Sequence, residues 1–377
     1  MSKKSAFAAL LLFFLVLAGV LSMKSARAGR IWTVDDNGSA DFHTIQEAVD
    51  AASEGDAVFV HSGTYLEHVS ITKTISLIGE NPLDTMVDTP GTSISGISIE
   101  ADNVAVKNFT VCNSRLTPHW SFYKGGGIYL YSAHGCDVEN CVVVGNTYGI
   151  NLVDSSYNNI SSNLVTDNGI GIPVWEHSSN NLIRENWVLN NNYEWGGVAL
   201  GPSSKNNTVV ENYLWNNTLR IDGYDPAMGD VFYSASGVVA CNNFMENATV
   251  LIDYYFGNWH PQPDIVWSME GQGNFWIGYS GVDADGDGLG DTPHVIDENN
   301  TDNYPLMKPY EWLQGDVNYD TVVNILDLFT IAKAFGSDVD YANWNPKCDL
   351  NNDKTINILD IASVASSFGK KMTWLSS

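Results

Sequence analysis

Acidic and amide side chains near the end of the chain recur at a spacing that suits one hard divalent cation. Oxygen-bearing residues stand at positions 1, 3, 5, 9 and 12 of a short stretch, and a second copy follows 33 residues later. Calcium takes about six to eight oxygen ligands, and position 7 of such a loop supplies a backbone carbonyl. One match could be an ordinary Asx-rich turn, but two in register favour calcium. The predicted ligands are Asp316, Asn318, Asp320, Asn324 and Asp327 in the first loop, and Asp349, Asn351, Asp353, Asn357 and Asp360 in the second.

A third acidic stretch precedes these two loops. Its carboxylates, Asp283, Asp285, Asp287 and Asp291, stand at positions 1, 3, 5 and 9, but position 12 is His294 instead of an acid. The spacing favours a structural calcium site, and a solvated acidic turn is the alternative.

Each C-terminal loop leads into one apolar helix, expected over residues 325–335 and 358–368. Helical periodicity places one set of apolar residues on a shared face, which we expect to form the core between the two helices. This set is Leu328, Ile331, Ala332 and Phe335 in the first helix and Ile361, Val364, Ala365 and Phe368 in the second. Leu326 and Phe329, with Leu359 and Ala362 at the matching places, then point away from that core. The pattern indicates a partner-binding face, or else a buried contact with the rest of the chain.

Residues 314–369 resemble a type I dockerin, the calcium-dependent module that inserts into a cohesin domain. The resemblance rests on the Gly-Asp-Val-Asn that opens the first loop, both loops, Trp-Asn-Pro before the second, and Phe-Gly after each helix. It implies a cohesin partner, and it adds Ile325 and Ile358 to the residues expected to contact it. Loop position 6 usually holds glycine for a sharp turn, whereas this chain has Thr321 and Lys354.

The middle of the chain is a repeat of short strands. Segments that begin at Gly127, Gly149, Gly171 and Gly197 align with steps of 22, 22 and 26 residues, and apolar residues alternate after each glycine. A unit this small cannot bury its own apolar face, so we expect stacked, hydrogen-bonded coils. A β-propeller repeat would be about twice as long. Asparagines nineteen residues after each glycine should form a ladder between coils, namely Asn146, Asn168, Asn190 and Asn216.

An amphipathic helix near residue 45, capped by Thr44 with Glu47 three residues on, precedes the first strands. This order resembles the pectin-lyase-like β-helix proteins, and more narrowly the NosD-type repeats, over residues 31–307. The fold expected is therefore mainly β, a right-handed parallel β-helix followed by a small α-helical dockerin with two calcium loops. The resemblance implies a fold and not an activity, because this fold supports lyases, hydrolases, epimerases and adhesins.

Two acids on the stack could do chemistry. Asp154 and Glu176 both stand five residues after their glycine, so adjacent coils should bring them to roughly 5 Å, a spacing that suits a retaining glycosidase or two ligands of one calcium. Solvated turn residues are the plain alternative. Exposed aromatic rings near them could bind the faces of sugars. The expected sugar-binding residues are Trp120, Tyr123, Tyr131, Trp175 and Trp195.

The N-terminus predicts export. A basic start, an apolar run over residues 6–21 and small residues before Gly29 are typical of a signal peptide, with a signal anchor as the alternative. No second run of membrane-spanning length follows, so the mature protein should be extracellular and attached to the cell through a partner. We expect a signal peptide at 1–28, the β-helix with its capping helix at 29–272, an Asp-rich closing segment at 273–310 and the dockerin at 311–377.

Composition narrows the function further. A formal charge of −26 excludes binding to nucleic acid or anionic membranes by charge. Five cysteines form no zinc spacing and no disulfide framework, and Cys136 and Cys141 could pair or remain buried thiols. Three functions remain. The first is a Ca²⁺-binding scaffold that binds polysaccharide or cell-surface glycan, the second a glycoside hydrolase or polysaccharide lyase, and the third a structural surface protein or adhesin.

Overall fold

The computed structural model describes eleven parts of the chain: residues 29–89, 95–115, 125–191, 196–222, 235–253, 263–310, 313–318, 320–338, 341, 345–351 and 353–371. The signal peptide expected at 1–28 lies outside them, as do Trp120, Tyr123 and Trp195. Within the described parts, no helix is long and apolar enough to cross a membrane.

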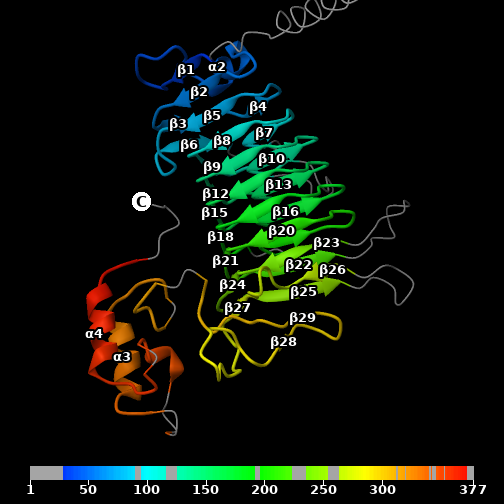
Figure 1. Cartoon of the computed structure of the whole chain (residues 1–377). Coiled ribbons are helices and arrows are strands. Elements are labelled where there is room, and N and C mark those ends of the chain that lie inside the picture. Colours follow the sequence, from blue (N-terminus) through cyan, green and yellow to red (C-terminus); the bar gives the residue numbers. More distant parts are fainter. Residues whose placement is uncertain are drawn as a thin grey trace, which may run out of the picture.

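Short strands stack in a column and form three parallel sheets (Figure 1). Sheet A holds β1 (Ile31–Val34), β2 (Ala57–Val60), β5 (Ser76–Gly79), β8 (Ala105–Lys107), β11 (Asp137–Glu139), β14 (Asn159–Ser161), β17 (Leu182–Arg184), β20 (Asn207–Val210), β23 (Ser236–Ala240) and β26 (Asp264–Val266). Sheet B holds β3 (Gly63–Tyr65), β6 (Thr85–Asp88), β9 (Thr110–Cys112), β12 (Val142–Val144), β15 (Leu164–Thr166), β18 (Trp187–Leu189), β21 (Tyr213–Trp215), β24 (Asn243–Phe244) and β27 (Phe275–Trp276). Sheet C holds β4 (Val69–Ile71), β7 (Ile97–Ile99), β10 (Ile128–Tyr131), β13 (Ile150–Val153), β16 (Ile172–Trp175), β19 (Val198–Leu200), β22 (Thr218–Asp222) and β25 (Thr249–Asp253).

The register follows the glycine alignment seen in the sequence. Ile128 pairs with Ile150 in the next coil, and Leu130 pairs with Leu152. These inward-facing side chains are fully buried and belong to one continuous core that runs the length of the stack. Each coil therefore buries its apolar face against its neighbours, and the parallel β-helix predicted from the repeat is confirmed.

A short helix covers the first coil. Helix α2 (Ile45–Ala51) begins at Thr44, whose hydroxyl accepts a hydrogen bond from the Glu47 N–H, as the sequence predicts. Its buried residues are Ile45, Ala48 and Val49. The Glu67 carboxylate accepts hydrogen bonds from the first N–H groups of the helix, which satisfies donors that have no partner within it. The helix thus closes the end of the core that would otherwise face water.

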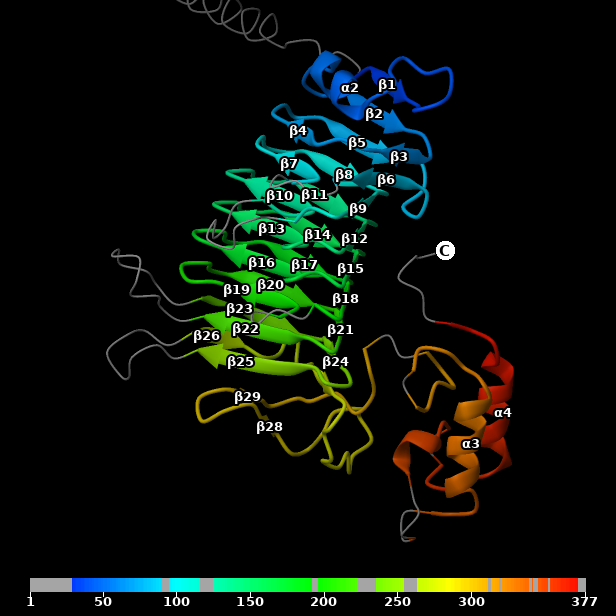
Figure 2. The ribbon, with the colours of Figure 1, turned by 180° about the vertical axis from the view of Figure 1, so that it is seen from behind.

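Beyond the last coil, an antiparallel pair, β28 (His294–Val295) and β29 (Thr301–Asp302), closes the other end of the column. The C-terminal module follows, with helix α3 (Ile325–Ala334), a short 3₁₀ turn (Pro346–Cys348) and helix α4 (Ile358–Ser367). Figure 2 shows α3 and α4 side by side. Their small shared core consists of Val317, Val323, Ile331, Ala334, Cys348, Leu350, Ile356 and Val364.

Buried asparagines connect the coils of the stack by side-chain hydrogen bonds. At each step one Oδ1 accepts from both the backbone N–H and the Nδ2 of the asparagine one coil earlier, as in Asn163 to Asn186, where both distances are 3.0 Å. Three such ladders run through the stack. They are Asn146–Asn168–Asn191–Asn217, Asn158–Asn181–Asn207, and Asn163–Asn186–Asn212–Asn242–Asn274.

The expected ladder is correct for Asn146 and Asn168 and wrong by one residue after them. Asn191 and Asn217 continue it, whereas Asn190 and Asn216 occupy left-handed corners with φ of 51° and 50°. The third and fourth coils each have one additional residue after the sheet C strand, because Asn181 and Asn207 stand ten residues after Gly171 and Gly197, whereas Asn158 stands nine after Gly149. Asn190 and Asn216 still touch, since the Asn216 Nδ2 donates to the Asn190 Oδ1 at 3.0 Å, but they do so outside the buried ladder.

Candidate functional sites

The first loop of the C-terminal module gathers three carboxylates. Oxygens of Asp316, Asp320 and Asp327 all lie within 4.8 Å of one another. Burial, together with the charges of Asp327 and Asp320, raises the pKa of Asp316 to about 6, against the lowering by backbone donors. Three converging, partly desolvated carboxylates repel one another, which a bound divalent cation would relieve.

Asp327 also fixes the start of the helix that follows. Its Oδ2 accepts from the Asn324 N–H at 2.8 Å, while the Asn324 Oδ1 accepts from the Leu326 N–H at 2.8 Å, a reciprocal capping box. Its Oδ1 accepts from the Val317 N–H at 2.9 Å, across the loop. One carboxylate therefore joins the loop, the helix and the candidate metal position.

The second loop repeats the same backbone arrangement. The Asp349 carboxylate accepts from the N–H groups of Asp353 and Lys354 at 3.1 and 2.9 Å, and Asp360 closes the capping box with Asn357 at 2.8 Å. Its carboxylates, unlike those of the first loop, do not come within 4.8 Å of one another as a group of three in the described structure. The two loops share their fold but differ in how closely their acids converge.

Position 6 of each loop adopts the backbone conformation that glycine favours. Thr321 has φ of 72° and Lys354 has φ of 67°. A side chain with a Cβ pays a steric cost in this left-handed region, and a β-branched threonine pays more than a lysine. The departure from glycine noted in the sequence is therefore a real source of strain in both loops.

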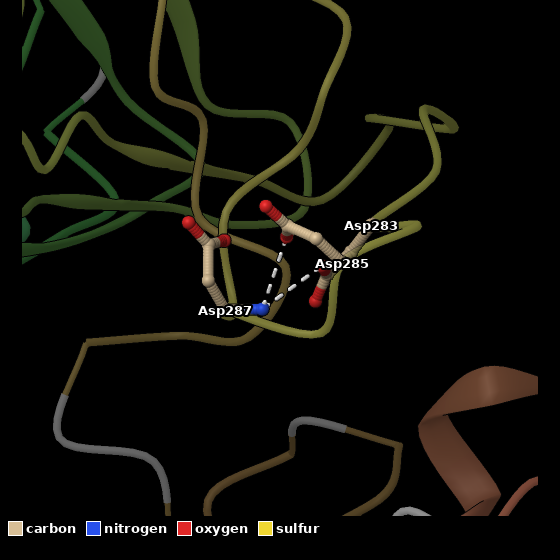
Figure 3. A group of neighbouring side chains, drawn as sticks. All are labelled: Asp283, Asp285 and Asp287. Carbon is tan, nitrogen blue, oxygen red and sulfur yellow. Dashed lines mark hydrogen bonds between the residues drawn. The ribbon is translucent and has the colours of Figure 1, made fainter.

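The third acidic stretch forms a compact turn. Oxygens of Asp283, Asp285 and Asp287 lie within 4.8 Å of one another, and Figure 3 shows the three side chains around the Asp287 N–H. That N–H donates to Asp283 at 3.1 Å and to Asp285 at 3.3 Å. The Asp291 carboxylate accepts from the Ala284 N–H at 2.7 Å, so it fastens the turn. His294 is directed elsewhere, since its ring stacks on Trp276 with centroids 4.3 Å apart.

The two helices of the module expose matching apolar side chains. Ile325 and Ile358 are 65% and 64% exposed, and Leu326 and Leu359 are 53% and 56% exposed. Phe329 is exposed as well, and so is the smaller Ala362 at its equivalent place. We refer to these six residues as the partner face. Their exposure excludes the alternative that the face is buried against the rest of the described chain.

The predicted core face of these helices is only partly right. Ile331 and Val364 are fully buried, and Leu328 and Ile361 pack at the edge of the core. Ala332, Ala365, Phe335 and Phe368 are exposed, in contrast to the expectation. Asp327 and Asp360 turn inward to cap their helices, and this rotates the buried face toward Ala334 and Ser367 instead.

On the stack, Asp154 and Glu176 follow paired strand residues in adjacent coils, and the Asp154 N–H donates to the Glu176 carbonyl at 3.0 Å. Both occupy left-handed corners, with φ of 49° and 25°. The His177 Nδ1 lies 3.3 Å from the Asp154 Oδ1. Burial raises the pKa of Glu176, the charge of Asp154 raises it further, and His177 opposes both. The two acids are therefore neighbours on adjacent coils, as their shared offset predicts, and the charge of Asp154 acts on Glu176.

The aromatic residues beside this pair divide into two groups. Tyr131 is 41% exposed and stacks on Tyr129, with ring centroids 5.9 Å apart. Trp175 is 3% exposed, so the expectation of an exposed ring there is wrong. Its ring lies against Gly201 in the next coil. Only a residue without a side chain leaves space for the ring there, because a Cβ on Gly201 would stand 2.5 Å from it. Trp175 therefore packs with Val153 and Ala199 in a small outer core.

Two family models match the chain. The family model described as "Periplasmic copper-binding protein (NosD)" matches residues 49–281, and the type I dockerin domain matches residues 314–368. The chain belongs to the NosD family. It joins a NosD-type parallel β-helix to a C-terminal dockerin, and the partner face and both acidic loops lie within the residues matched to the dockerin.

The chain is also similar to individual proteins over part of its length. A cell surface glycoprotein of Methanothermus fervidus is 26% identical over 224 residues, which cover 49% of this chain but only 35% of that protein. A pectin methylesterase from Erwinia chrysanthemi is 11% identical with a TM-score of 0.42, covering 58% of this chain and 80% of that one. The pectate lyase Pel9A is 14% identical with a TM-score of 0.36, covering 66% and 74%. At these values the solved structures say nothing about activity.

The copper in the family's description does not fit the residues of this chain. Copper favours thiolate, thioether and imidazole ligands. All five cysteines are buried and free, and burial raises the pKa of the Cys141 thiol to about 12. In the part of the chain that the structure describes, the groups of three or more converging His, Cys, Asp or Glu side chains consist of aspartates alone. Oxygen ligands of this kind suit calcium.

Sequence reasoning missed two of the three asparagine ladders. Their signal was present, because Asn158 and Asn163 each recur in the next coil as Asn181 and Asn186. Cys136 and Cys141 begin these two ladders, where their backbone N–H groups donate to Asn158 and Asn163. The two cysteines are thus buried, unpaired thiols at ladder positions.

Proposed function

We propose that this protein is an exported, calcium-dependent member of a cohesin–dockerin complex, whose β-helix holds a polysaccharide or a cell-surface glycan. One observation carries the proposal: two helices with the same capping box expose the same isoleucine and leucine, to nearly the same extent. A monomer gains nothing from exposing such a repeated apolar pair, whereas a partner surface would bury it.

Calcium has a defined part in this function. The ligand residues close each loop against its helix through Asp327 and Asp360, so an ion in the loop would fix the direction of the helix that bears the partner face. Ion binding should therefore order the partner face before a cohesin arrives, and binding without calcium should be weak.

The partner face can be tested by charge. Leu326→Asp together with Leu359→Asp should abolish binding of the full chain to a cohesin from the same source, because an apolar pocket cannot solvate two carboxylates. Each single change should weaken binding only slightly if the two copies substitute for each other through their pseudo-symmetry. Titration calorimetry in calcium would measure both effects.

Leu83→Asp provides a matched control, since Leu83 is 54% exposed and lies far from the dockerin in the sequence. It should bind like the parent chain. Circular dichroism should show the same calcium-bound helix content in all variants. Full cohesin affinity in the double variant would contradict the proposal, and loss of helix content would show that the leucines support the fold instead.

The β-helix is the second site. Asp154 and Glu176 on adjacent coils, with the exposed ring of Tyr131 at the neighbouring offset, offer acceptors and an apolar surface for a sugar chain. Binding is favoured over catalysis because the sequence around the two acids has no catalytic motif that assigns acid, base or nucleophile roles, although Glu100 of the coil before Tyr131 adds a further acid beside Tyr129. A glycoside hydrolase or polysaccharide lyase remains the alternative, and a surface protein without glycan affinity is the third.

A panel of polysaccharides separates these three. Retention without product formation supports binding, new reducing ends indicate hydrolysis, and ultraviolet absorbance from an unsaturated product indicates lyase action. Asp154→Asn and Glu176→Gln should weaken retention several-fold, and they should cut turnover by orders of magnitude if the pair is catalytic. Glu246→Gln, at an exposed corner, is the control. Parent-like behaviour of both variants would exclude this site.

Two observations support an extracellular or cell-surface location. The matched relative is a cell surface glycoprotein, and the N-terminal residues have the pattern of a signal peptide. Protease treatment of intact cells, followed by detection of the chain, would test it. Protection of the whole chain inside the cell would contradict export.

A further inference from the structure

Seven asparagines stand in the acceptor sequence for N-glycosylation, Asn-X-Ser/Thr, and the structure sorts them by what their side chains do. They are Asn37, Asn108, Asn159, Asn206, Asn216, Asn247 and Asn299. An N-linked glycan needs a side-chain amide that projects into solvent and that the fold does not use. The sites therefore differ in whether a modified side chain can coexist with the folded stack.

Three of these amides are part of the stack's own bonding. The Asn108 Nδ2 donates to the Gly79 carbonyl at 3.1 Å, and its Oδ1 accepts from Asn140 at 2.9 Å. The Asn159 Nδ2 donates to Asp137 at 3.2 Å. Like these two, Asn216 is only partly exposed, and its amide is bonded to Asn190 in the preceding coil. A sugar on any of the three nitrogens would displace a contact between coils.

Three other amides are free for modification. Asn206, Asn247 and Asn299 are exposed, and their side chains make no hydrogen bond within the described structure. Asn206 precedes β20 and Asn247 precedes β25, each in a left-handed corner with φ of 55°. Asn299 lies in the turn between β28 and β29. These positions direct a side chain away from the column without loss of any bond that holds it.

Asn37 has features of both groups. It is exposed, but its Nδ2 donates to the adjacent Asp36 carboxylate at 2.8 Å. Asn37 therefore belongs to neither group.

We propose that Asn206, Asn247 and Asn299 carry N-linked glycans in the exported protein, and that Asn108, Asn159 and Asn216 do not. The donor is a lipid-linked oligosaccharide phosphate, encountered during the proposed export. The Asn Nδ2 forms a bond to the anomeric carbon of the first sugar, and the bond from that carbon to the phosphate oxygen breaks. The amide loses one proton and the lipid phosphate leaves with the electron pair, so no oxidant or reductant is needed.

The location of the three sites gives the modification a physical consequence. All three lie after residue 200, in the later coils and the closing hairpin. Bulky hydrated chains there would shield the end of the column at which β25 and β26 are the outermost strands of their sheets. Exposed apolar side chains on those strands, Leu251 at 42% and Val266 at 51%, are the kind that promote association between strand edges.

Glycopeptide mapping of the mature chain purified from its source cells tests the proposal. Sugar should be found on the peptides with Asn206, Asn247 and Asn299, and it should disappear site by site in Asn206→Gln, Asn247→Gln and Asn299→Gln. Asn216→Gln, the matched control, should leave the glycan mass unchanged and lower the melting temperature. Unmodified peptides at all three sites, or sugar on Asn108, Asn159 or Asn216, would overturn it. Cohesin binding is measured on unglycosylated protein, so a failure of the proposed cohesin function and a failure of the proposed glycosylation can be told apart.

Discussion

The β-helix and the dockerin both bury polar side chains, but they satisfy them in opposite ways. In the stack, neutral amides bond to one another from coil to coil, so donors and acceptors are matched within the chain. In the first dockerin loop, three carboxylates converge within 4.8 Å, and burial with the charges of the other two raises the pKa of Asp316. The stack satisfies its buried amides within the polypeptide, whereas we expect the first dockerin loop to need a bound cation. This difference predicts where each part is vulnerable.

The largest expected effect comes from breaking a ladder. Asn186 accepts two hydrogen bonds from Asn163 and donates to the Ile160 carbonyl and to Asn212. Asn186→Ala leaves these buried partners unsatisfied and should lower the free energy of unfolding of the β-helix by about 3 to 6 kcal/mol. Chemical denaturation would measure it. Asn159→Ala, at a partly exposed strand position, should cost under about 1 kcal/mol, and equal losses would contradict the ladder's importance.

Calcium removal should act mainly on the dockerin. At a hundredfold excess over its dissociation constant, a bound ion stabilises the folded module by about 2.7 kcal/mol per site. Dialysis against chelator should therefore lower a dockerin transition in calorimetry and leave the β-helix transition in place. Parallel shifts of both transitions would show that the stack also depends on calcium, with the Asp283 turn as the first place to look.

The smallest expected effect concerns position 6 of the two dockerin loops. Thr321→Gly and Lys354→Gly relieve a left-handed backbone and should each strengthen calcium binding, by up to about 1 kcal/mol, with the larger gain at the β-branched threonine. The flexibility of glycine in the unfolded chain opposes part of this gain. Calcium titration of the two variants against the parent would measure it. Weaker binding in both would mean that strain at position 6 is not limiting.

Regular repetition made much of the fold predictable. The glycine-aligned segments fixed the strand register, because each coil buries equivalent apolar residues against the last. The convergence of Asp316, Asp320 and Asp327 was predictable for a similar reason, because oxygen atoms at set spacings come together when a loop closes. Thr44 as a helix cap followed from local chemistry alone.

The wrong predictions concern residues whose burial depends on neighbouring coils or helices. One additional residue in the third coil moves the ladder from Asn190 to Asn191, which counting from a glycine cannot detect. Trp175 alternates outward as expected, yet Gly201 in the next coil lets its ring lie flat and become buried. Helical periodicity placed Phe335 and Phe368 in the core, but the inward turn of Asp327 and Asp360 rotates both helices. The additional residue, the space that Gly201 leaves for the Trp175 ring and the rotation of the two helices have no local sequence signal.

The long ladder ends at a carboxylate, and this gives the stack an electrical direction. The amides of Asn163, Asn186, Asn212 and Asn242 each donate to the Oδ1 of the asparagine in the next coil, so their side-chain dipoles add head to tail, as peptide dipoles do along a helix. The positive end of that series falls at Asn274, whose N–H donates to the fully buried Asp302 at 2.7 Å. The Trp276 indole N–H and the Tyr304 N–H also donate to this carboxyl group, each at 3.0 Å, so its acceptors are satisfied at the end of the ladder where the amide dipoles present their positive side. The column has a polarity, and Asp302 is its counter-ion.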